Sequence, residues 1–220
     1  MDTKRHLIIG DVHGDHKGMD HLIRSAIEAW GEVDRIVQVG DFGYFPRTLS
    51  PPRVDHGVPQ IFLRGNHEDH STIHTLTYWG AWEYAKDGYM DEYGCLFLGG
   101  AMCTDREERG QGGPYGWHDN EELEDEGWER IMDETDFTQV KYVFSHDCPD
   151  FLLPMIKPQR KYTTKTSLWL QKVANEVSNV EWFFGHHHTT GSWMIGDNRY
   201  RLIDMISNGR NRSMYVLETD

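Results

Sequence analysis

The stretch Leu7-Ile8-Ile9-Gly10-Asp11-Val12-His13-Gly14 sets a pattern that the rest of the chain repeats. An apolar run that ends in glycine, followed by a segment of helical period, is typical of a buried strand entering a turn. In α/β sheets, ligands bind at the carboxyl ends of such strands. Asp11 and His13 are two residues apart at this end, so we expect their side chains on the same side. Residues 10–14 also fit a second interpretation, a turn whose aspartate caps the next helix.

The same kind of ending recurs along the chain. Apolar segments at 34–39, 60–63, 141–144 and 180–184 predict four further strands. The polar stretches that follow them are Gly40-Asp41, Arg64-Gly65-Asn66-His67-Glu68, Ser145-His146-Asp147 and Gly185-His186-His187-His188. Because parallel strands bring their carboxyl ends to one edge of a sheet, we expect these side chains to converge. Carboxylate and imidazole ligands offered together suit Mn²⁺, Fe or Zn²⁺ better than Ca²⁺ or Mg²⁺.

The remaining segments predict helices and a second group of strands. Helical spacing indicates helices at 21–30 and 166–177, and an acidic surface helix at 120–134. Short β-like runs between glycines at 78–102 favour antiparallel hairpins. Residues 200–206 and 213–217 are expected to form a closing hairpin of a second sheet. Together these elements predict one α/β domain over residues 1–220.

Composition narrows the possible partners and the compartment. The formal net charge is −14, with much of the acid at 105–136, so binding of long nucleic acid is not expected. There is no apolar run of about 20 residues for a membrane span and no secretory signal before the first strand. Cys95, Cys103 and Cys148 are few, odd in number and not in metal-finger spacing, which favours a reducing compartment. We therefore expect a cytoplasmic protein.

Taken in order, five of these motifs resemble the signature of the calcineurin-like metallophosphoesterase family. They are Asp11-x-His13, Gly40-Asp41, Gly65-Asn66-His67-Glu68, an isolated His146 and Gly185-His186-x-His188, which span most of the chain. One such motif is weak evidence, whereas five in order are strong. The resemblance implies a four-layer αββα sandwich, in which two mixed β-sheets pack face to face with helices outside.

The resemblance also implies a binuclear metal centre at the strand ends. It places Asp11, His13, Asp41 and His188 on one metal, and Asp41, Asn66, His146 and His186 on the other, with Asp41 as a bridge. Mn²⁺ is the leading expectation, and the same ligands admit Fe, Zn²⁺, Co²⁺ or Ni²⁺. Two such cations would lower the pKa of a shared water, so that hydroxide is available near neutral pH for in-line attack on the phosphorus. Catalysis is thus expected from Asp41 and His67.

By the same resemblance, His67 is the candidate general acid, which would protonate the leaving oxygen. Glu68, Asp69 or another carboxylate would keep it protonated, and the sequence does not choose between them. For substrate contacts we expect Asn66, Arg109 and His70, although Arg109 is equally well explained as a solvated loop residue.

The second motif departs from the protein phosphatases of the same superfamily. In those enzymes it continues to Asp-Arg-Gly, whereas here it reads Gly40-Asp41-Phe42-Gly43-Tyr44-Phe45-Pro46, without the arginine that clamps phosphate. A diester carries less negative charge than a monoester and needs fewer cationic contacts. The sequence therefore favours a phosphodiesterase acting on small diesters, with 2′,3′-cyclic nucleotides as the leading hypothesis. Its loops hold Tyr44, Phe45, His70, Tyr115 and Trp117, which are candidates for stacking on a base.

Three alternatives stay open from the sequence. The same fold supports phosphomonoesterases and protein phosphatases, and an exonuclease-like role belongs to the same enzyme class. A binding protein that has kept the fold and lost activity is the alternative outside that class.

Overall fold

The strands form two mixed sheets in a computed structural model that describes residues 3–103, 106, 110–111, 116–159, 163–208 and 212–219. The first sheet has the order β11-β1-β2-β3-β5-β4, and the second has the order β6-β7-β8-β10-β9. In the first sheet, β1, β2, β3 and β5 are parallel, while β11 and β4 pair antiparallel at its two edges. In the second, β6, β7, β8 and β10 are parallel and β9 is antiparallel.

The strand bounds in the first sheet are β1 Lys4–Ile9, β2 Arg35–Gln38, β3 Gln60–Phe62, β4 Tyr78–Trp79, β5 Trp82–Tyr84 and β11 Met214–Thr219. Those in the second sheet are β6 Cys95–Leu98, β7 Tyr142–Ser145, β8 Glu181–Phe184, β9 Gly191–Ile195 and β10 Asn198–Leu202.

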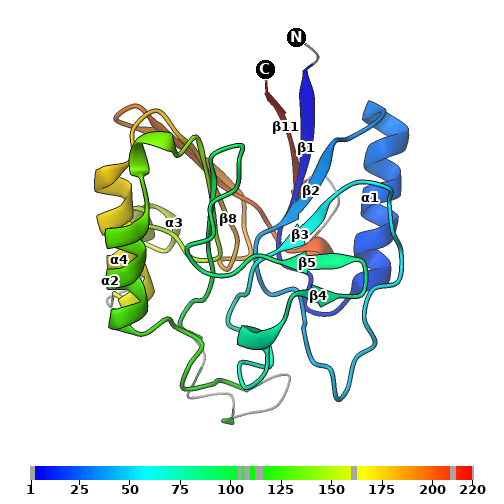
Figure 1. The fold of residues 1–220 in the computed structure, drawn as a ribbon, viewed down its shortest axis with the longest axis horizontal. Coiled ribbons are helices and arrows are strands. Elements are labelled where there is room, and N and C mark those ends of the chain that lie inside the picture. Colours follow the sequence, from blue (N-terminus) through cyan, green and yellow to red (C-terminus); the bar gives the residue numbers. More distant parts are fainter. Residues whose placement is uncertain are drawn as a thin grey trace.

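Helices cover the two outer faces of the paired sheets. Figure 1 shows α1 on one side and α2, α3 and α4 on the other, with both sheets between them. The helices are α1 His16–Trp30, α2 Asp125–Glu134, α3 Leu153–Ile156 and α4 Lys165–Glu176. Short 3₁₀ turns lie at Ile73–Thr75, Phe137–Gln139, Asp150–Leu152 and Ile206–Asn208. The predicted α/β fold of four layers, αββα, with two mixed sheets is therefore confirmed.

Alternation along the strands explains why this arrangement needs three apolar layers. Leu7 and Ile9 pack toward α1, while Ile8 between them packs in the layer between the sheets. Likewise, Phe183 faces the layer between the sheets, and its neighbours in β8 face α2 and α4. Because a strand points successive side chains to opposite faces, an uninterrupted apolar run marks a strand that is buried on both sides.

One of the predicted strand pairings is wrong, and another is incomplete. The segment 95–98 was expected in an antiparallel hairpin, and residues 95–97 do pair antiparallel with residues 88–91, where Met90 bridges Leu96. The sequence did not predict that the other edge of β6 pairs parallel with β7 in the second sheet. The segments 200–206 and 213–217 were expected to pair with each other, but β10 lies in the second sheet and β11 crosses to pair with β1 in the first. Period-2 patterns report which faces of a strand are buried but do not report its neighbour, so both kinds of pairing satisfy them. Among the described residues, no helix is long and apolar enough to cross a bilayer.

Candidate metal centre

Four side chains converge where β1, β2 and β8 end. The Nε2 atom of His188 lies 3.2 Å from Oδ2 of Asp11 and 3.1 Å from Nε2 of His13. His13 Nε2 is in turn 3.7 Å from Oδ2 of Asp41. Asp11 is fully buried, while the side chains of His13 and His188 are 27% and 40% exposed. The cluster of Asp11, His13, Asp41 and His188 is therefore able to hold one cation and is open to solvent on its histidine side.

A second cluster lies on the other side of Asp41. His146 Nε2 is 3.3 Å from Oδ1 of Asp41 and 3.2 Å from Oδ1 of Asn66. The opposite ring nitrogen, Nδ1, is 2.9 Å from the carbonyl oxygen of Val39, which fixes the ring so that Nε2 faces the cluster. With His186, these residues form a buried group that is able to hold a second cation.

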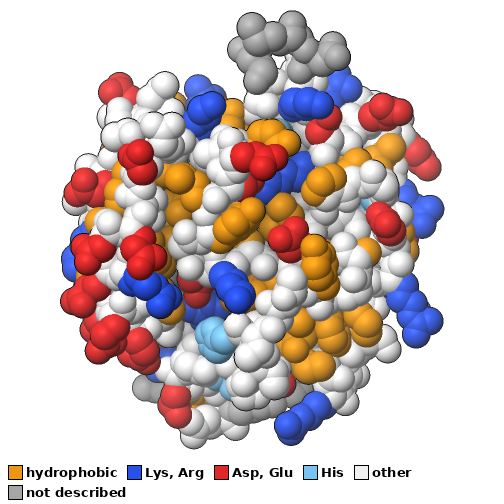
Figure 2. All heavy atoms as spheres, viewed as in Figure 1, with side chains coloured by type: hydrophobic (Ala, Val, Ile, Leu, Met, Phe, Trp, Pro, Cys, Tyr) orange, Lys and Arg blue, Asp and Glu red, His pale blue; other side chains and the backbone are white. Residues whose placement is uncertain are grey.

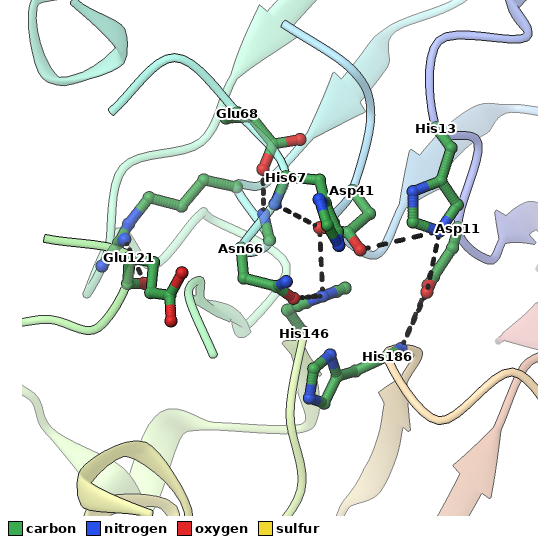
Figure 3. Close-up of polar contacts among 12 residues, drawn as sticks. Asp11, His13, Asp41, Asn66, His67, Glu68, Glu121, His146 and His186 are labelled. Atoms are coloured by element: carbon green, nitrogen blue, oxygen red, sulfur yellow. Dashed lines mark hydrogen bonds and ion pairs between the residues drawn. The ribbon is translucent and has the colours of Figure 1, made fainter. Parts of the chain in front are cut away.

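Asp41 is shared by the two clusters. Its Oδ2 faces His13 and its Oδ1 faces His146, and Figure 3 shows it between the two groups of side chains. Burial alone would raise the pKa of Asp41, but the positive charges of His146, His67 and His13 lower it well below its ordinary value. Asp41 is therefore an ionised carboxylate with one oxygen on each cluster.

Backbone conformation marks the same residues. Four of the five non-glycine residues with positive φ in the described chain are His13 at 49°, Asp41 at 53°, His186 at 66° and His188 at 50°. This region is sparsely populated by residues with a Cβ and costs on the order of 1–3 kcal/mol each. Since the fold tolerates this cost at four of the convergent side chains, their orientation is fixed by the surrounding structure.

The donor set fits transition-metal cations. Among the described residues, Nε2 of His186 is buried without a hydrogen-bond partner. No contact therefore offsets the cost of removing this nitrogen from water. Burial lowers the pKa of His186 well below its ordinary value, which keeps the ring neutral and its lone pair available. Carboxylate, imidazole and amide donors together suit Mn²⁺, Fe, Zn²⁺, Co²⁺ or Ni²⁺.

Comparison with known protein families identifies the family of this chain. The sequence model of the calcineurin-like phosphoesterase family, Metallophos, matches residues 4–204. The chain belongs to this family. A search of curated proteins found no match. Among solved structures, one similar chain is a conserved uncharacterized protein from Streptococcus pneumoniae TIGR4, described as a predicted phosphoesterase, at 14% identity. The match covers 100% of this chain and 85% of that chain with a TM-score of 0.38, which is too low to carry an argument.

Membership in the calcineurin-like phosphoesterase family makes this protein a metal-dependent phosphoesterase, and its Asp and His clusters are able to hold the metals. His67 lies beside these clusters. Its backbone N–H donates to Oδ1 of Asp41 at 2.8 Å, and its ring centroid is 5.2 Å from that of His13. His67 is thus next to the more open cluster without being part of either group.

Glu68, which the sequence offered as a partner for His67, has a different place. Its two carboxylate oxygens accept from the backbone N–H groups of Gly43, at 3.2 Å, and Gly65, at 2.7 Å. Glu68 therefore ties the loop after β2 to the loop after β3. Burial and the nearby charge of Asp41 raise its pKa to about 8. Asp69, the other candidate, accepts from Ser71.

The predicted substrate contacts lie in different surroundings in the structure. His70 is fully buried, with Nε2 3.1 Å from the carbonyl oxygen of Asn66, so it supports the loop rather than facing a substrate. Tyr44 and Phe45, two of the predicted stacking residues, are also buried. Asn66 contacts His146 in the second cluster, while Arg109 and Tyr115 lie outside the described residues. Sequence patterns place such residues in loops, but they do not say which way a loop side chain points.

Gly65 provides a test of how tightly the centre is packed. A Cβ at this position would lie 2.1 Å from Oδ1 of Asp41 and 2.7 Å from Nε2 of His146. We expect Gly65→Ala to displace Asp41 and to lower the metal content well below that of the wild type. Overpacking itself should cost about 1–3 kcal/mol of stability. Elemental analysis and a urea melt measure the two effects. Gly110→Ala is the matched control, since a Cβ there would meet no described residue within 4 Å. An unchanged metal content in Gly65→Ala would show that Asp41 is not a ligand.

Metal binding should release protons, because in the metal-free protein His146 is protonated. Burial alone would lower the pKa of His146, but Asp41 raises it to about 10. A cation needs the lone pair on Nε2, so the proton must leave when the cation binds. Apparent affinity should therefore rise about tenfold per pH unit from neutrality toward the pKa of His146. Calorimetric titration with Mn²⁺ in buffers of different ionisation enthalpy counts the released protons. Binding without proton release would exclude His146 as a ligand.

Proposed function

We propose that this protein is a phosphodiesterase that hydrolyses small phosphodiesters with two transition-metal ions. The observation that carries the proposal is the carboxylate of Asp41, which offers one oxygen to each of two neighbouring histidine clusters. A carboxylate with its two oxygens directed this way suits a bridge between two cations. The proposed ligands are Asp11, His13, Asp41 and His188 for one cation and Asp41, Asn66, His146 and His186 for the other.

Few of the proposed ligands carry a negative charge that would offset the charge of the cations. Two bound cations would neutralise phosphate oxygens and lower the pKa of a water molecule to near neutrality. Neutral imidazoles and the amide of Asn66 hold cations without cancelling their charge, so the centre stays electrophilic. Asp11 and Asp41 supply the only carboxylates in the two groups.

His67 is the proposed general acid. It is buried to 8% exposure, and its ring packs against that of His13 beside the open cluster. From this position its imidazolium would protonate the oxygen of the leaving group, a step worth typically 10²–10⁴-fold in rate. The backbone N–H of His67 holds Oδ1 of Asp41, so the same residue also orients the proposed bridge.

The preference for diesters rests on the loop after β2. Tyr44 and Phe45 stand where related protein phosphatases have Asp-Arg, and both are buried, with Tyr44 packed against Trp79. Arg64, the basic residue next to the third motif, is fully buried and donates to Asp87 at 2.8 Å. Neither segment gives the centre a cation for the second negative charge of a monoester, so a diester with one charge is the better match.

A small substrate fits the surface charge. Figure 2 shows acidic side chains gathered on the side of the molecule covered by α2, which carries Asp125, Glu126, Glu129, Asp133 and Glu134. Such a surface repels the backbone of a long nucleic acid. We propose 2′,3′-cyclic nucleotides as the leading substrates, because a strained five-membered cyclic phosphate reacts in a site that holds little more than the phosphate.

The test is a comparison of kcat/KM with Mn²⁺ present. Aryl phosphodiesters should be hydrolysed faster than matched aryl monoesters, and 2′,3′-cyclic AMP faster than 3′,5′-cyclic AMP or a nucleoside monophosphate. A preference for the monoesters would overturn the proposal in favour of a phosphomonoesterase. Tight binding of metal with no turnover of any ester would indicate a binding protein that has kept the fold.

A further inference from the structure

Two neighbouring loops carry three of the proposed metal-binding histidines. His146 follows β7, and His186 and His188 follow β8. Between these residues in sequence lie Asp147 and His187, which have no place among the proposed ligands. Both side chains are completely shielded from solvent, as is the chain at Cys148. Buried polar groups of this kind need a reason to be there, because desolvation without a partner is unfavourable.

The side chains of these two residues contact each other across the loops. Nε2 of His187 lies 3.1 Å from Oδ1 of Asp147 and 3.4 Å from Sγ of Cys148. The backbone N–H of Cys148 donates to the same Oδ1 at 2.8 Å, and the hydroxyl of Thr164 donates to Oδ2 at 3.4 Å. Asp147 is therefore held on both oxygens, and His187 is its contact with the other loop.

This contact lies directly behind the proposed ligands. The backbone N–H of Gly185 donates to the carbonyl oxygen of His146 at 3.1 Å, so main chain and side chains join the two loops side by side. The ring of His187 packs edge-on against that of His186, with centroids 5.0 Å apart. Both neighbours of His187 have positive φ, 66° at His186 and 50° at His188. The backbone on each side of His187 is therefore in the sparsely populated left-handed region. His187 is the anchored residue between two strained ones.

We propose that Asp147 and His187 are positioning residues that hold His146, His186 and His188 in place for the metals. The inference rests on the proposed function, because it assumes that these three histidines bind cations. If His187 is removed, the loop after β8 loses its side-chain anchor to the loop after β7. The strained conformations of its neighbours can then relax. Partners that orient metal ligands in this way typically change metal affinity by 10–100-fold when they are replaced.

The same trio has a second interpretation as a third cation site. Asp147, Cys148 and His187 each offer one ligand atom, and these atoms lie within 4.8 Å of one another. The hydrogen bonds that Asp147 accepts from Cys148 and Thr164 fix its carboxylate on the loop after β7, as the positioning role requires. The two interpretations differ in the number of cations bound, so one titration distinguishes them.

The experiment uses His187→Ala with a rescue variant and a matched control. Mn²⁺ affinity is measured by calorimetric titration of the metal-free proteins, and the melting temperature is measured separately. We expect His187→Ala to bind Mn²⁺ about 10–100-fold more weakly than the wild type. His187→Gln should regain most of the affinity, because its amide N–H₂ reaches close to the position of Nε2 and donates to Asp147.

Asn198→Ala is the control for a purely structural effect. Asn198 is a buried polar residue that ties down the opposite end of β8, accepting from the N–H of Val180 at 3.1 Å and donating to the carbonyl oxygen of Val177 at 3.1 Å. We expect its replacement to lower the melting temperature while leaving Mn²⁺ affinity unchanged. Should His187→Ala fail to fold, Asp147→Asn serves in its place with the same expected loss of affinity.

The possible results of these titrations separate the positioning role of His187 from the proposed function. The inference is overturned if His187→Ala binds Mn²⁺ within twofold of the wild type, or if Asn198→Ala loses affinity equally. It is also overturned if the wild type binds a third cation that is lost in Cys148→Ser, since the trio is then itself a metal site. A wild type that binds no Mn²⁺ contradicts the proposed function instead.

Discussion

Asp41→Asn should deplete both metal positions and lower phosphoesterase activity by on the order of 10³-fold or more. Asparagine has the shape of aspartate, but it has one oxygen in place of two and carries no charge. Asp41 faces His13 with one oxygen and His146 with the other. If the amide keeps its oxygen on one cluster, it presents an N–H₂ group to the other, which repels a cation. Elemental analysis of the purified variant should find less than one equivalent of metal.

His13→Ala is the comparison for this prediction. His13 belongs to one cluster alone, so its loss should reduce occupancy at that position and leave the second position largely filled. Asp41→Asn should therefore cost more metal than His13→Ala. A full two equivalents in Asp41→Asn would show that Asp41 does not bridge.

His67→Ala should slow the hydrolysis of alkyl or nucleoside esters by about 10²–10⁴-fold and that of p-nitrophenyl esters far less. An alkoxide leaving group needs a proton in the transition state, whereas p-nitrophenolate leaves without one. Metal content should stay near normal, because the contact of His67 with Asp41 uses the backbone N–H, which alanine keeps. Steady-state kinetics on the two ester classes and elemental analysis give the answer.

A uniform loss on both ester classes would make His67 a residue that positions substrate rather than an acid. A loss of metal would instead place its side chain in the metal centre. His70→Ala is a useful companion variant, because His70 supports the same loop from a fully buried position. Its effect should appear as reduced stability and should not depend on the leaving group.

The sequence predicted the strands and their polar ends, because a strand buried on both faces has few alternatives to an apolar run that stops in a turn. Leu7, Val37 and Phe183 lie in such runs, and the side chains that follow them meet at the two clusters. The order of the motifs then predicted the four-layer fold through the family resemblance. The polar side chains that converge at the strand ends could thus be predicted from local sequence.

Contacts between segments that are distant in sequence could not be predicted from local sequence. The pairing of β11 with β1 joins residues about as far apart in sequence as the chain allows, and alternation in either strand fits several partners. Glu68 stands in a recognised motif, yet its contacts with Gly43 and Gly65 depend on how two loops approach each other. The contact of His187 with Asp147 likewise joins two loops that are distant in sequence, so only the structure shows it.

We propose that this protein is a phosphodiesterase whose two cations are held by Asp11, His13, Asp41, Asn66, His146, His186 and His188. The most direct measurement is a titration of metal-free protein with Mn²⁺, in which bound metal and hydrolysis of bis-p-nitrophenyl phosphate are followed in the same samples. We expect activity to stay low at one equivalent of Mn²⁺ and to reach its maximum at two. Full activity at one equivalent, or no hydrolysis of the diester when two are bound, would contradict it.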